Sequence, residues 1–237
     1  MMLLFTKMLL AHLLGDFVLQ PDSWVLSKVK YKAKSPYLYL HVLLHGLLLL
    51  MFLADFQLSI FIGLIVLSHY FIDLTKLWLH GKLNERKLFF LDQLFHLLVL
   101  VGITAWISGE KIAFTESQIT TLIYLATALI CLTFVAARVI RIIMTSWKVT
   151  EDNMGESLQN AGMYIGILER LFVFCFIVLN QWSALGFLIA AKSIFRFSDL
   201  SRAKDRKLTE YILIGTLVSF GLAVLIGLVY KAFLPTA

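Results

Sequence analysis

Residues 36–54 read PYLYLHVLLHGLLLLMFLA, an apolar run that is long enough to enter a membrane and that still carries two histidines. His41 and His45 are four residues apart, so they lie on one face of a helix. An ionisable side chain inside a membrane segment is costly unless it is paired or functional. The run therefore predicts a membrane helix that presents two imidazoles in the same direction.

Three more pairs with this spacing lie in the neighbouring apolar segments. Each joins a histidine to an aspartate: His12 with Asp16, His69 with Asp73, and Asp92 with His96. The four pairs use five of the six histidines and leave only His80. A lone membrane histidine more often forms a hydrogen bond between helices than binds a metal, and a lone His–Asp pair also fits a proton relay or a salt bridge. Four pairs together favour a metal site.

The composition is typical of a membrane protein. It is 60% hydrophobic and only 15% charged, and apolar runs of about 17–25 residues recur along the chain. These features predict an all-α, polytopic helical membrane protein and argue against a soluble protein with a large core. No cleavable signal peptide is expected, because the first apolar run has no basic leader followed by a small-residue cleavage site.

About eight segments are expected to form transmembrane or membrane-embedded helices. Their approximate bounds are 3–19, 37–54, 58–78, 88–107, 118–140, 162–181, 183–199 and 210–231. We expect residues 1–110 to form a four-helix metal-binding half and residues 111–237 a second four-helix half, within one compact membrane domain. Thr145–Asn160 is the longest polar interruption between the segments.

Lysine and arginine are distributed unequally between the expected loops. The loops after the first, third, fifth and seventh segments, with the adjoining helix ends, hold all of the 21 lysines and arginines except Lys7, Lys111, Arg170 and Lys231. The positive-inside rule places those loops in the cytoplasm and both termini outside. Topology thus explains the net charge of +6, and no nucleic-acid binding is expected.

This topology brings all four pairs to one depth near the cytoplasmic face. The pairs in the first and third segments lie near the ends of those segments, and the pairs in the second and fourth lie near the starts. A helical bundle with inward carboxylates and imidazoles is a known way to hold two metals. Mixed nitrogen and oxygen ligands suit zinc, with manganese or iron as alternatives. Eight ligand-type groups predict one or two divalent ions, with the remaining groups supporting the ligands.

The second half carries charged residues within or beside its apolar segments: Glu169, Arg170, Lys192 and Arg196. In one interpretation they form an anion-binding wall beside the metals, with the three cations facing a phosphate. In the other they are cations that extend toward the membrane surface, together with one ion pair between helices that involves Glu169. Both interpretations remain open from the sequence.

Several strings resemble the bacterial membrane-protein family known as domain of unknown function 3307. The strings are HLLGDFVLQ from His12, YLHVLLHG from Tyr39, SHYFID from Ser68, LDQLFH from Leu91, GILER ending at Arg170 and KSIFRF from Lys192. The resemblance implies an integral protein of the bacterial inner membrane and implies no reaction. More distantly, histidine and aspartate at such spacings are similar to inner-membrane metal-dependent hydrolases related to zinc phospholipase C and P1 nuclease.

The leading functional prediction is a membrane-embedded, metal-dependent hydrolase that cleaves a phosphoester at the cytoplasmic leaflet. Two metals could polarise phosphoryl oxygens and lower the pKa of a bound water to about 7. Asp16 or Asp92 is expected to act as general base, and Gln20 and Gln93 to position the substrate. The lipid environment favours a lipid or prenyl phosphate. No G-x-S-x-G motif is present, which argues against a serine hydrolase.

Two alternatives use the same residues. One is a metal or proton transporter, which would need polar residues that continue to the outer face; the outer thirds of the first four segments offer almost none. The other is a non-catalytic membrane protein in which the metal only stabilises the bundle. It predicts that chelation unfolds the protein without any turnover being found.

Overall fold

The computed structural model describes residues 1–109, 118–147, 161–197 and 206–234. Every regular element in these ranges is a helix, and no strand occurs in them, so the all-α prediction is confirmed for the described part of the chain. The chain divides into two compact units, Met1–Thr127 and Ala128–Ala237. The border falls inside helix α6 (Gln118–Ile130).

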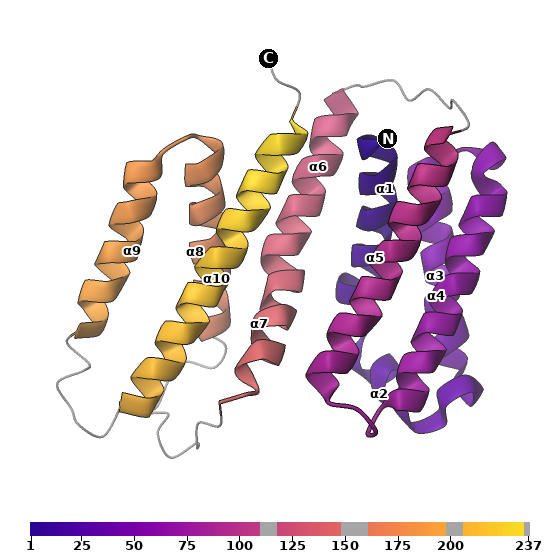
Figure 1. Cartoon of the computed structure of the whole chain (residues 1–237), viewed down its shortest axis with the longest axis horizontal. Coiled ribbons are helices and arrows are strands. Elements are labelled where there is room, and N and C mark those ends of the chain that lie inside the picture. Colours follow the sequence, from indigo (N-terminus) through magenta and orange to yellow (C-terminus); the bar gives the residue numbers. More distant parts are fainter. Residues whose placement is uncertain (110–117, 148–160, 198–205, 235–237) are drawn as a thin grey trace. The chain divides into compact units, whose positions relative to one another are not determined.

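Four helices of the first unit form a bundle. They are α1 (Met2–Leu13), α3 (Pro36–Leu53), α4 (Ser59–Leu79) and α5 (Glu85–Gly109). Both α1 and α4 pack against α3 and α5, so the four helices enclose one core (Figure 1). Proline suits the first turn of a helix because its missing N–H would have no partner there, and Pro36 is the first residue of α3.

Each helix of the bundle buries one stripe of residues spaced three or four positions apart, as expected for a helix with one inward face. The buried stripe of α3 reads His41, His45, Leu48, Leu49 and Leu53. The buried stripe of α5 reads Asp92, His96, Leu100, Ile103, Thr104 and Ile107. The order is reversed in α4, where Phe61, Ile62 and Ile65 precede His69 and Asp73. The bundle core is therefore polar at one end and apolar along the rest of its length.

The chain bends sharply after α1. A π-helical turn, η1 (Leu14–Val18), follows α1, and α2 (Asp22–Tyr31) then leaves at 85° to it. Pro21 sits at the bend in an extended conformation; a proline lacks the N–H that a continuing helix needs, and it disfavours helix at the residue before it. A short 3₁₀ turn, η2 (Lys32–Lys34), leads into α3. As a result α2 lies at the end of the bundle where α4 turns into α5 (Figure 1).

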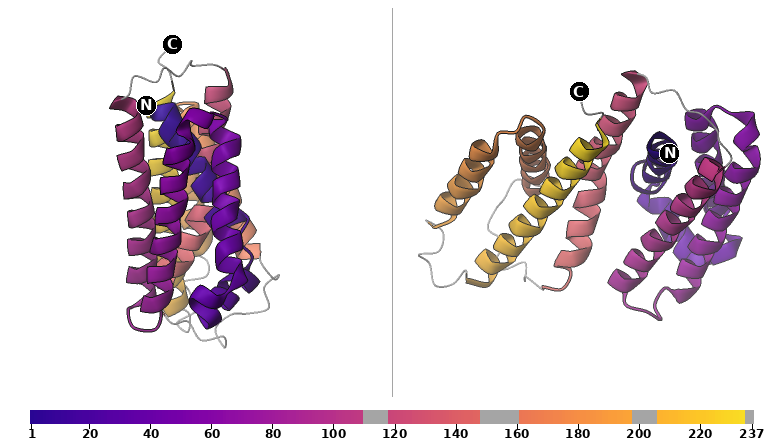
Figure 2. Two further views of the ribbon diagram at one scale, coloured as in Figure 1. Left: turned by 90° about the vertical axis from the view of Figure 1, so that its right-hand side faces the viewer. Right: turned by 45° about the horizontal axis from the view of Figure 1, so that its top comes forward.

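In the described residues, the second unit consists of the end of α6 and five further helical elements. They are the π-helical turn η4 (Cys131–Val135), α7 (Ala136–Met144), α8 (Ala161–Val178), α9 (Trp182–Phe197) and α10 (Arg206–Phe233). Helix α10 packs against α8 and α7, and α9 folds back on α8 (Figure 2). In the first unit, the 3₁₀ turn η3 (Phe56–Leu58) joins α3 to α4.

Six helical stretches are long and apolar enough to cross a membrane. They are Pro36–Leu53, Phe56–Leu79, Glu85–Gly109, Ile119–Met144, Ala161–Val178 and Glu210–Phe233. The first predicted segment belongs to the bent pair Met2–Val18 and Asp22–Lys34, which would make a seventh span, and the predicted segment 183–199 contains only a shorter apolar helix, Trp182–Ile194. These helices are consistent with a membrane protein. The eight-helix count and the orientation of the termini stay predictions.

Helices α8 and α10 pack closely where Ile177 meets Gly227. A Cβ at Gly227 would lie 3.1–3.2 Å from three atoms of Ile177, whereas a Cβ at Gly221 would meet nothing within 4 Å. Gly227→Leu is expected to destabilise the protein by about 1–3 kcal/mol through overpacking, relative to Gly221→Leu, which makes the same chemical change in open space. Thermal unfolding in detergent measures the difference. Equal unfolding temperatures for the two variants would contradict this packing.

Candidate metal centre

The four i, i+4 pairs meet in one buried layer of the first unit. His12 lies in the last turn of α1, Asp16 lies in η1, and His41 and His45 lie in α3. The other two pairs lie in α4 and α5. Seven of the eight side chains are buried, and each of the seven exposes 4% or less of its surface; the eighth, Asp16, is nearly buried. The structure thus brings together all eight residues that the sequence predicts as ligands.

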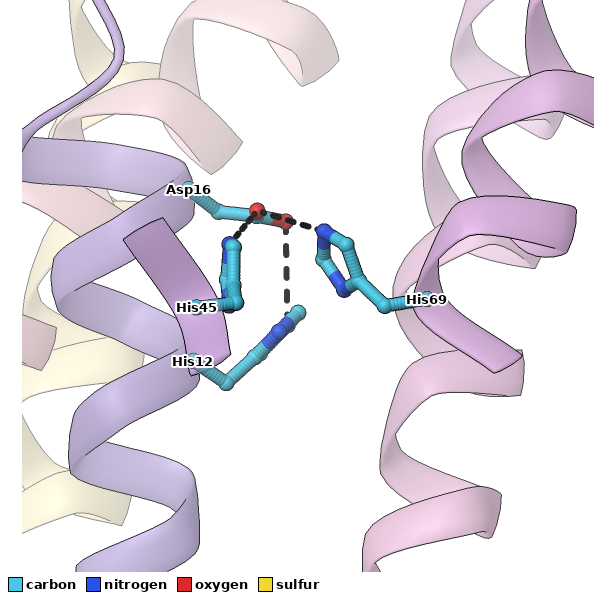
Figure 3. Close-up of side chains that lie close together, drawn as sticks. All are labelled: His12, Asp16, His45 and His69. Atoms are coloured by element: carbon cyan, nitrogen blue, oxygen red, sulfur yellow. Dashed lines mark hydrogen bonds and ion pairs between the residues drawn. The ribbon is translucent and has the colours of Figure 1, made fainter. Parts of the chain in front are cut away.

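The centre of the layer contains three imidazoles around one carboxylate, drawn in Figure 3. Asp16 Oδ1 lies 3.1 Å from Nε2 of His45 and 3.7 Å from Nε2 of His69, and Asp16 Oδ2 lies 3.7 Å from Nε2 of His12. One ligand-type atom from each of these four residues lies within 4.8 Å of every other. Three nitrogens and one oxygen at such distances form a donor set of the kind that zinc prefers.

Two further groups share residues with this centre. His41, His69 and Asp73 form one group, and Asp16, Asp92 and His96 form the other, with their ligand-type atoms again within 4.8 Å of one another. His69 therefore belongs to two groups and so does Asp16. Sharing of this kind fits two adjacent ions better than two independent sites.

His96 presents an unpartnered nitrogen to the layer. Its Nδ1 lies 2.9 Å from the backbone carbonyl oxygen of Asp92; a carbonyl only accepts, so Nδ1 carries the proton and donates it. In the neutral ring, Nε2 then holds a lone pair, and this atom is buried with no hydrogen-bond partner among the described residues. The second oxygen of Asp92, Oδ1, is buried without a partner as well. A histidine that donates one ring N–H to a carbonyl and offers the other nitrogen has the arrangement of a metal ligand.

The π-helical turn and Gly15 bring the first pair close to the others. Such turns inside helices frequently mark functional sites. A Cβ placed on Gly15 would lie 2.4 Å from two atoms of the His45 ring, so only glycine allows α3 and η1 to approach this closely. The sequence contains this glycine directly before Asp16, but its role depends on a contact with a residue 30 positions away and cannot be read from local spacing.

The two glutamines contact the ligand-type residues. Gln93 Nε2 donates to Asp16 Oδ2 at 3.0 Å and lies 3.2 Å from Asp92 Oδ2, while its Oε1 lies 3.3 Å from His12 Nε2. Gln20 Nε2 lies 2.9 Å from Nδ1 of His41. The sequence predicts that both glutamines position a substrate, which stays a prediction. In the structure their side chains contact carboxylates and imidazoles of the layer.

Two lysines that the sequence analysis did not single out contact the layer. Lys28, from α2, is buried and donates to Asp73 Oδ2 at 2.8 Å. Lys76, from α4, donates to Asp92 Oδ2 at 2.6 Å, and 36% of its side chain remains exposed. Lys76 follows Asp73 by three positions, so spacing could have suggested it. Lys28 reaches Asp73 only because the chain bends at Pro21.

The charged residues of the second half lie in the second unit. Lys192 donates to Glu169, which forms an ion pair between α9 and α8. Arg170 is buried; its Nε donates to the backbone carbonyl of Leu132 at 2.5 Å within the π-helical turn η4, and its Nη1 lies 3.2 Å from Ser219 Oγ. The side chain of Arg196 lies outside the described residues. The ion pair of the second interpretation is present, and the anion-binding wall stays a prediction.

The close approach at Gly15 predicts a loss of metal affinity in Gly15→Ala. The added methyl group must displace the His45 ring, and changes that misplace a ligand typically reduce metal affinity by about 10–100-fold. The matched control is Gly63→Ala in α4, where a Cβ meets nothing within 4 Å. Competition with a chelator of known affinity measures the effect. Equal affinities in the two variants would show that His45 does not need this position.

The buried pair of Lys28 and Asp73 predicts a stability effect in metal-free protein. Lys28→Met leaves a buried carboxylate without its cation, which typically costs about 3–5 kcal/mol. Lys30→Met, at an exposed position of the same helix, is the control and is expected to change little. Thermal unfolding in the presence of a chelator measures both. The double variant Lys28→Met with Asp73→Asn should recover most of the loss, and no recovery would contradict a direct pairing.

Comparison with known proteins places the first unit in a family. A family model described as "Protein of unknown function (DUF3307)" matches residues 4–123, a region that holds all eight residues of the layer, both glutamines and both lysines. The similar strings of the second half, at Arg170 and Lys192, lie beyond the matched residues. No curated protein matches, and no solved structure matches. The chain belongs to the DUF3307 family.

Proposed function

We propose that the protein is a membrane-embedded, metal-dependent hydrolase that cleaves the phosphoester of a lipid or prenyl phosphate at the cytoplasmic leaflet. One observation carries the proposal. Five imidazoles and three carboxylates from four helical segments converge in one layer, with His96 Nε2 and Asp92 Oδ1 buried and unpartnered among the described residues. Buried polar atoms are nearly always partnered, so two open ligand atoms in one layer support a bound ion.

The ligand roles follow from the contacts. His12, Asp16, His45 and His69 are the four residues that would hold a first ion, with His96 and Asp92 beside them for a second. Zinc suits this nitrogen and oxygen set, and manganese or iron are alternatives. When bound, such an ion supplies Lewis acidity toward phosphoryl oxygens and acidifies a water molecule.

In a centre that binds one ion through His12, Asp16, His45 and His69, Asp92 is not needed as a ligand and is the better candidate for general base. Asp16 lies near four imidazoles, those of His12, His41, His45 and His69, and so has the contacts of a shared ligand. Oδ1 of Asp92 instead has no hydrogen-bond partner among the described residues and lies 3.8 Å from Nδ1 of His96, while its Oδ2 is held by Lys76 and Gln93. A base needs a free acceptor atom within reach of the proton that it removes. Of the two predicted candidates, the geometry favours Asp92.

The bundle core favours hydrolysis over transport. Beyond the polar layer the core is filled mainly by leucine, isoleucine, methionine and phenylalanine side chains. The buried hydroxyls of Thr6 and Thr104 each donate to a carbonyl of their own helix. A transport path needs polar groups that can contact an ion on both sides of the ion site, and within the described bundle the buried ionisable groups all lie in or beside the layer. This leaves access from the end of the bundle that holds α2 and the α4–α5 turn, which the positive-inside rule predicts to be cytoplasmic.

The test combines elemental analysis with an assay for phosphate release. Purified wild-type protein, His45→Ala and Asp92→Asn are compared with His80→Ala, which removes an exposed histidine outside the layer. We expect near-stoichiometric zinc, manganese or iron in the wild type and in His80→Ala, and reduced metal in the other two variants. At saturating metal, Asp92→Asn is expected to slow release of phosphate from long-chain alkyl phosphates by about 10²–10⁴-fold.

The possible outcomes separate the functions. Wild-type protein that holds no metal and cannot be reloaded would contradict the hydrolase. Bound metal whose chelation unfolds the protein, with no turnover of any lipid phosphate, would support the structural role instead. Metal uptake into sealed vesicles that is lost in His45→Ala would support transport.

A further inference from the structure

A largely apolar groove lies on the first unit beside the metal layer. It has a volume of about 310 Å³ and runs between α4 and α5 near the turn that joins them. Its apolar lining includes Phe71, Leu88, Leu91 and Phe95. The volume is within the range of small-molecule sites, which are mostly apolar with a few placed polar groups.

The polar groups of the groove are concentrated in one ion pair. Lys76 and Asp92 both line it, joined by the 2.6 Å contact of Nζ with Oδ2. Asp92 exposes 1% of its side chain, whereas Lys76 exposes 36%, so the ammonium is the charge that a ligand in the groove would meet. Asp92 also belongs to the group of Asp16 and His96. The pair is therefore a common wall between the groove and the metal layer.

The other side chains that line the groove have no polar group available to a ligand. The hydroxyl of Thr75, the one other polar side chain of the groove, donates to the carbonyl of Phe71 at 2.8 Å. Phe71, Leu91 and Phe95 are exposed, with 55%, 42% and 52% of their surfaces free. In an α4 and α5 that cross a membrane, these side chains contact lipid. The groove is thus open to a hydrocarbon chain that arrives from the side, within the bilayer.

Charge at the end of the α4–α5 hairpin matches an anionic head group. Lys76, Lys82 and Lys87 lie within and beside the turn, and Glu85 is the one acidic residue between Leu77 and Leu91. Basic residues near the membrane surface attract anionic lipids. A chain in the groove would place such a head group near Lys76, at the edge of the layer.

We propose that the α4–α5 groove binds the hydrocarbon chain of a lipid phosphate and that Lys76 binds its phosphate beside Asp92. This inference rests on the proposed function and specifies its substrate as a lipid that enters laterally from the bilayer. Leu91 and Phe95 determine how much space the groove has for the hydrocarbon chain, and Lys76 makes the groove selective for an anionic head group. Binding requires neither turnover nor a bound ion, so it can be tested separately from catalysis.

The test is photolabelling of the full chain in lipid nanodiscs. The probe is dodecyl phosphate with a diazirine on its chain, and dodecanol with the same diazirine reports chain binding without charge. Peptide mapping should find the phosphate probe on residues 71–79 and 88–95, both with and without metal. Leu91→Trp fills the groove and should reduce this labelling by about tenfold, the loss expected when one specific contact of about 1.4 kcal/mol is removed. Leu98→Trp, an exposed leucine of α5 outside the groove, should not.

The head group is tested in the same assay. Lys76→Met should reduce labelling by the phosphate probe about tenfold while leaving the dodecanol probe unchanged, because it removes a charge-assisted hydrogen bond. Lys76→Arg, which keeps the cation, should retain most of the labelling. It is the control that separates loss of charge from misfolding of the Met variant. Competition by inorganic phosphate at the probe's concentration would show that free phosphate is the ligand and would overturn the role of the chain.

Other outcomes decide between the two proposals. Label spread evenly over lipid-facing helices, or equal labelling of Leu91→Trp and Leu98→Trp, would overturn the groove. Groove labelling in a protein that releases no phosphate would support this site while removing the proposed hydrolysis. Phosphate release with no labelling of the groove would support the hydrolysis and overturn the groove as the lipid-binding site.

Discussion

Burying charge in an apolar bundle is the constraint on which the rest of this structure depends. A carboxylate or imidazole within a membrane segment must find a partner, and here the partners come from different helices. Asp16 meets imidazoles from α1, α3 and α4, and Asp73 and Asp92 meet lysines. The contacts that hold the layer together therefore also compensate for its burial. In the part of the chain that the structure describes, two buried atoms, His96 Nε2 and Asp92 Oδ1, have no hydrogen-bond partner.

Helical periodicity made much of this layer predictable. Four-residue spacing puts His41 above His45 and His69 above Asp73, and antiparallel neighbours then bring all four pairs to one depth. The all-α fold and the family follow from the same strings. The number of membrane spans was less predictable from the sequence. The first predicted span is part of a helix pair that bends near Pro21, and the predicted span 183–199 contains only the shorter apolar helix Trp182–Ile194.

What the sequence could not predict depends on contacts between distant residues. Lys28 reaches Asp73 across 45 positions, and Gly15 accommodates the ring of His45 across 30. The π-helical turns η1 and η4 cannot be recognised from the spacing of apolar residues in the sequence. The first nevertheless carries Asp16, and the Leu132 carbonyl of the second accepts a hydrogen bond from Arg170. Local spacing identifies which side chains are unusual for a membrane helix; the tertiary structure decides which of them are neighbours.

The two lysines show how one charge pattern can serve two purposes. Lys28 is the buried residue of α2 and pairs with Asp73, so this ion pair stabilises the layer. Lys76 makes the same kind of pair with Asp92 but remains open to the α4–α5 groove. An ion pair at the border of a ligand groove can exchange partners with an anionic head group, whereas a sealed pair cannot. This difference in exposure is the physical basis for the proposal that a substrate binds on the Lys76 side of the layer.

X-ray absorption spectroscopy of protein loaded with one equivalent of zinc tests the central claim most directly, because it reports the atoms around the ion. Nitrogen and oxygen neighbours at about 2.0–2.1 Å, with the multiple scattering of about three imidazoles, are expected for an ion held by His12, Asp16, His45 and His69. A spectrum with sulfur neighbours, or with water oxygens and no imidazole signal, would place the ion elsewhere. The layer would then be a hydrogen-bonded polar network and not a metal centre.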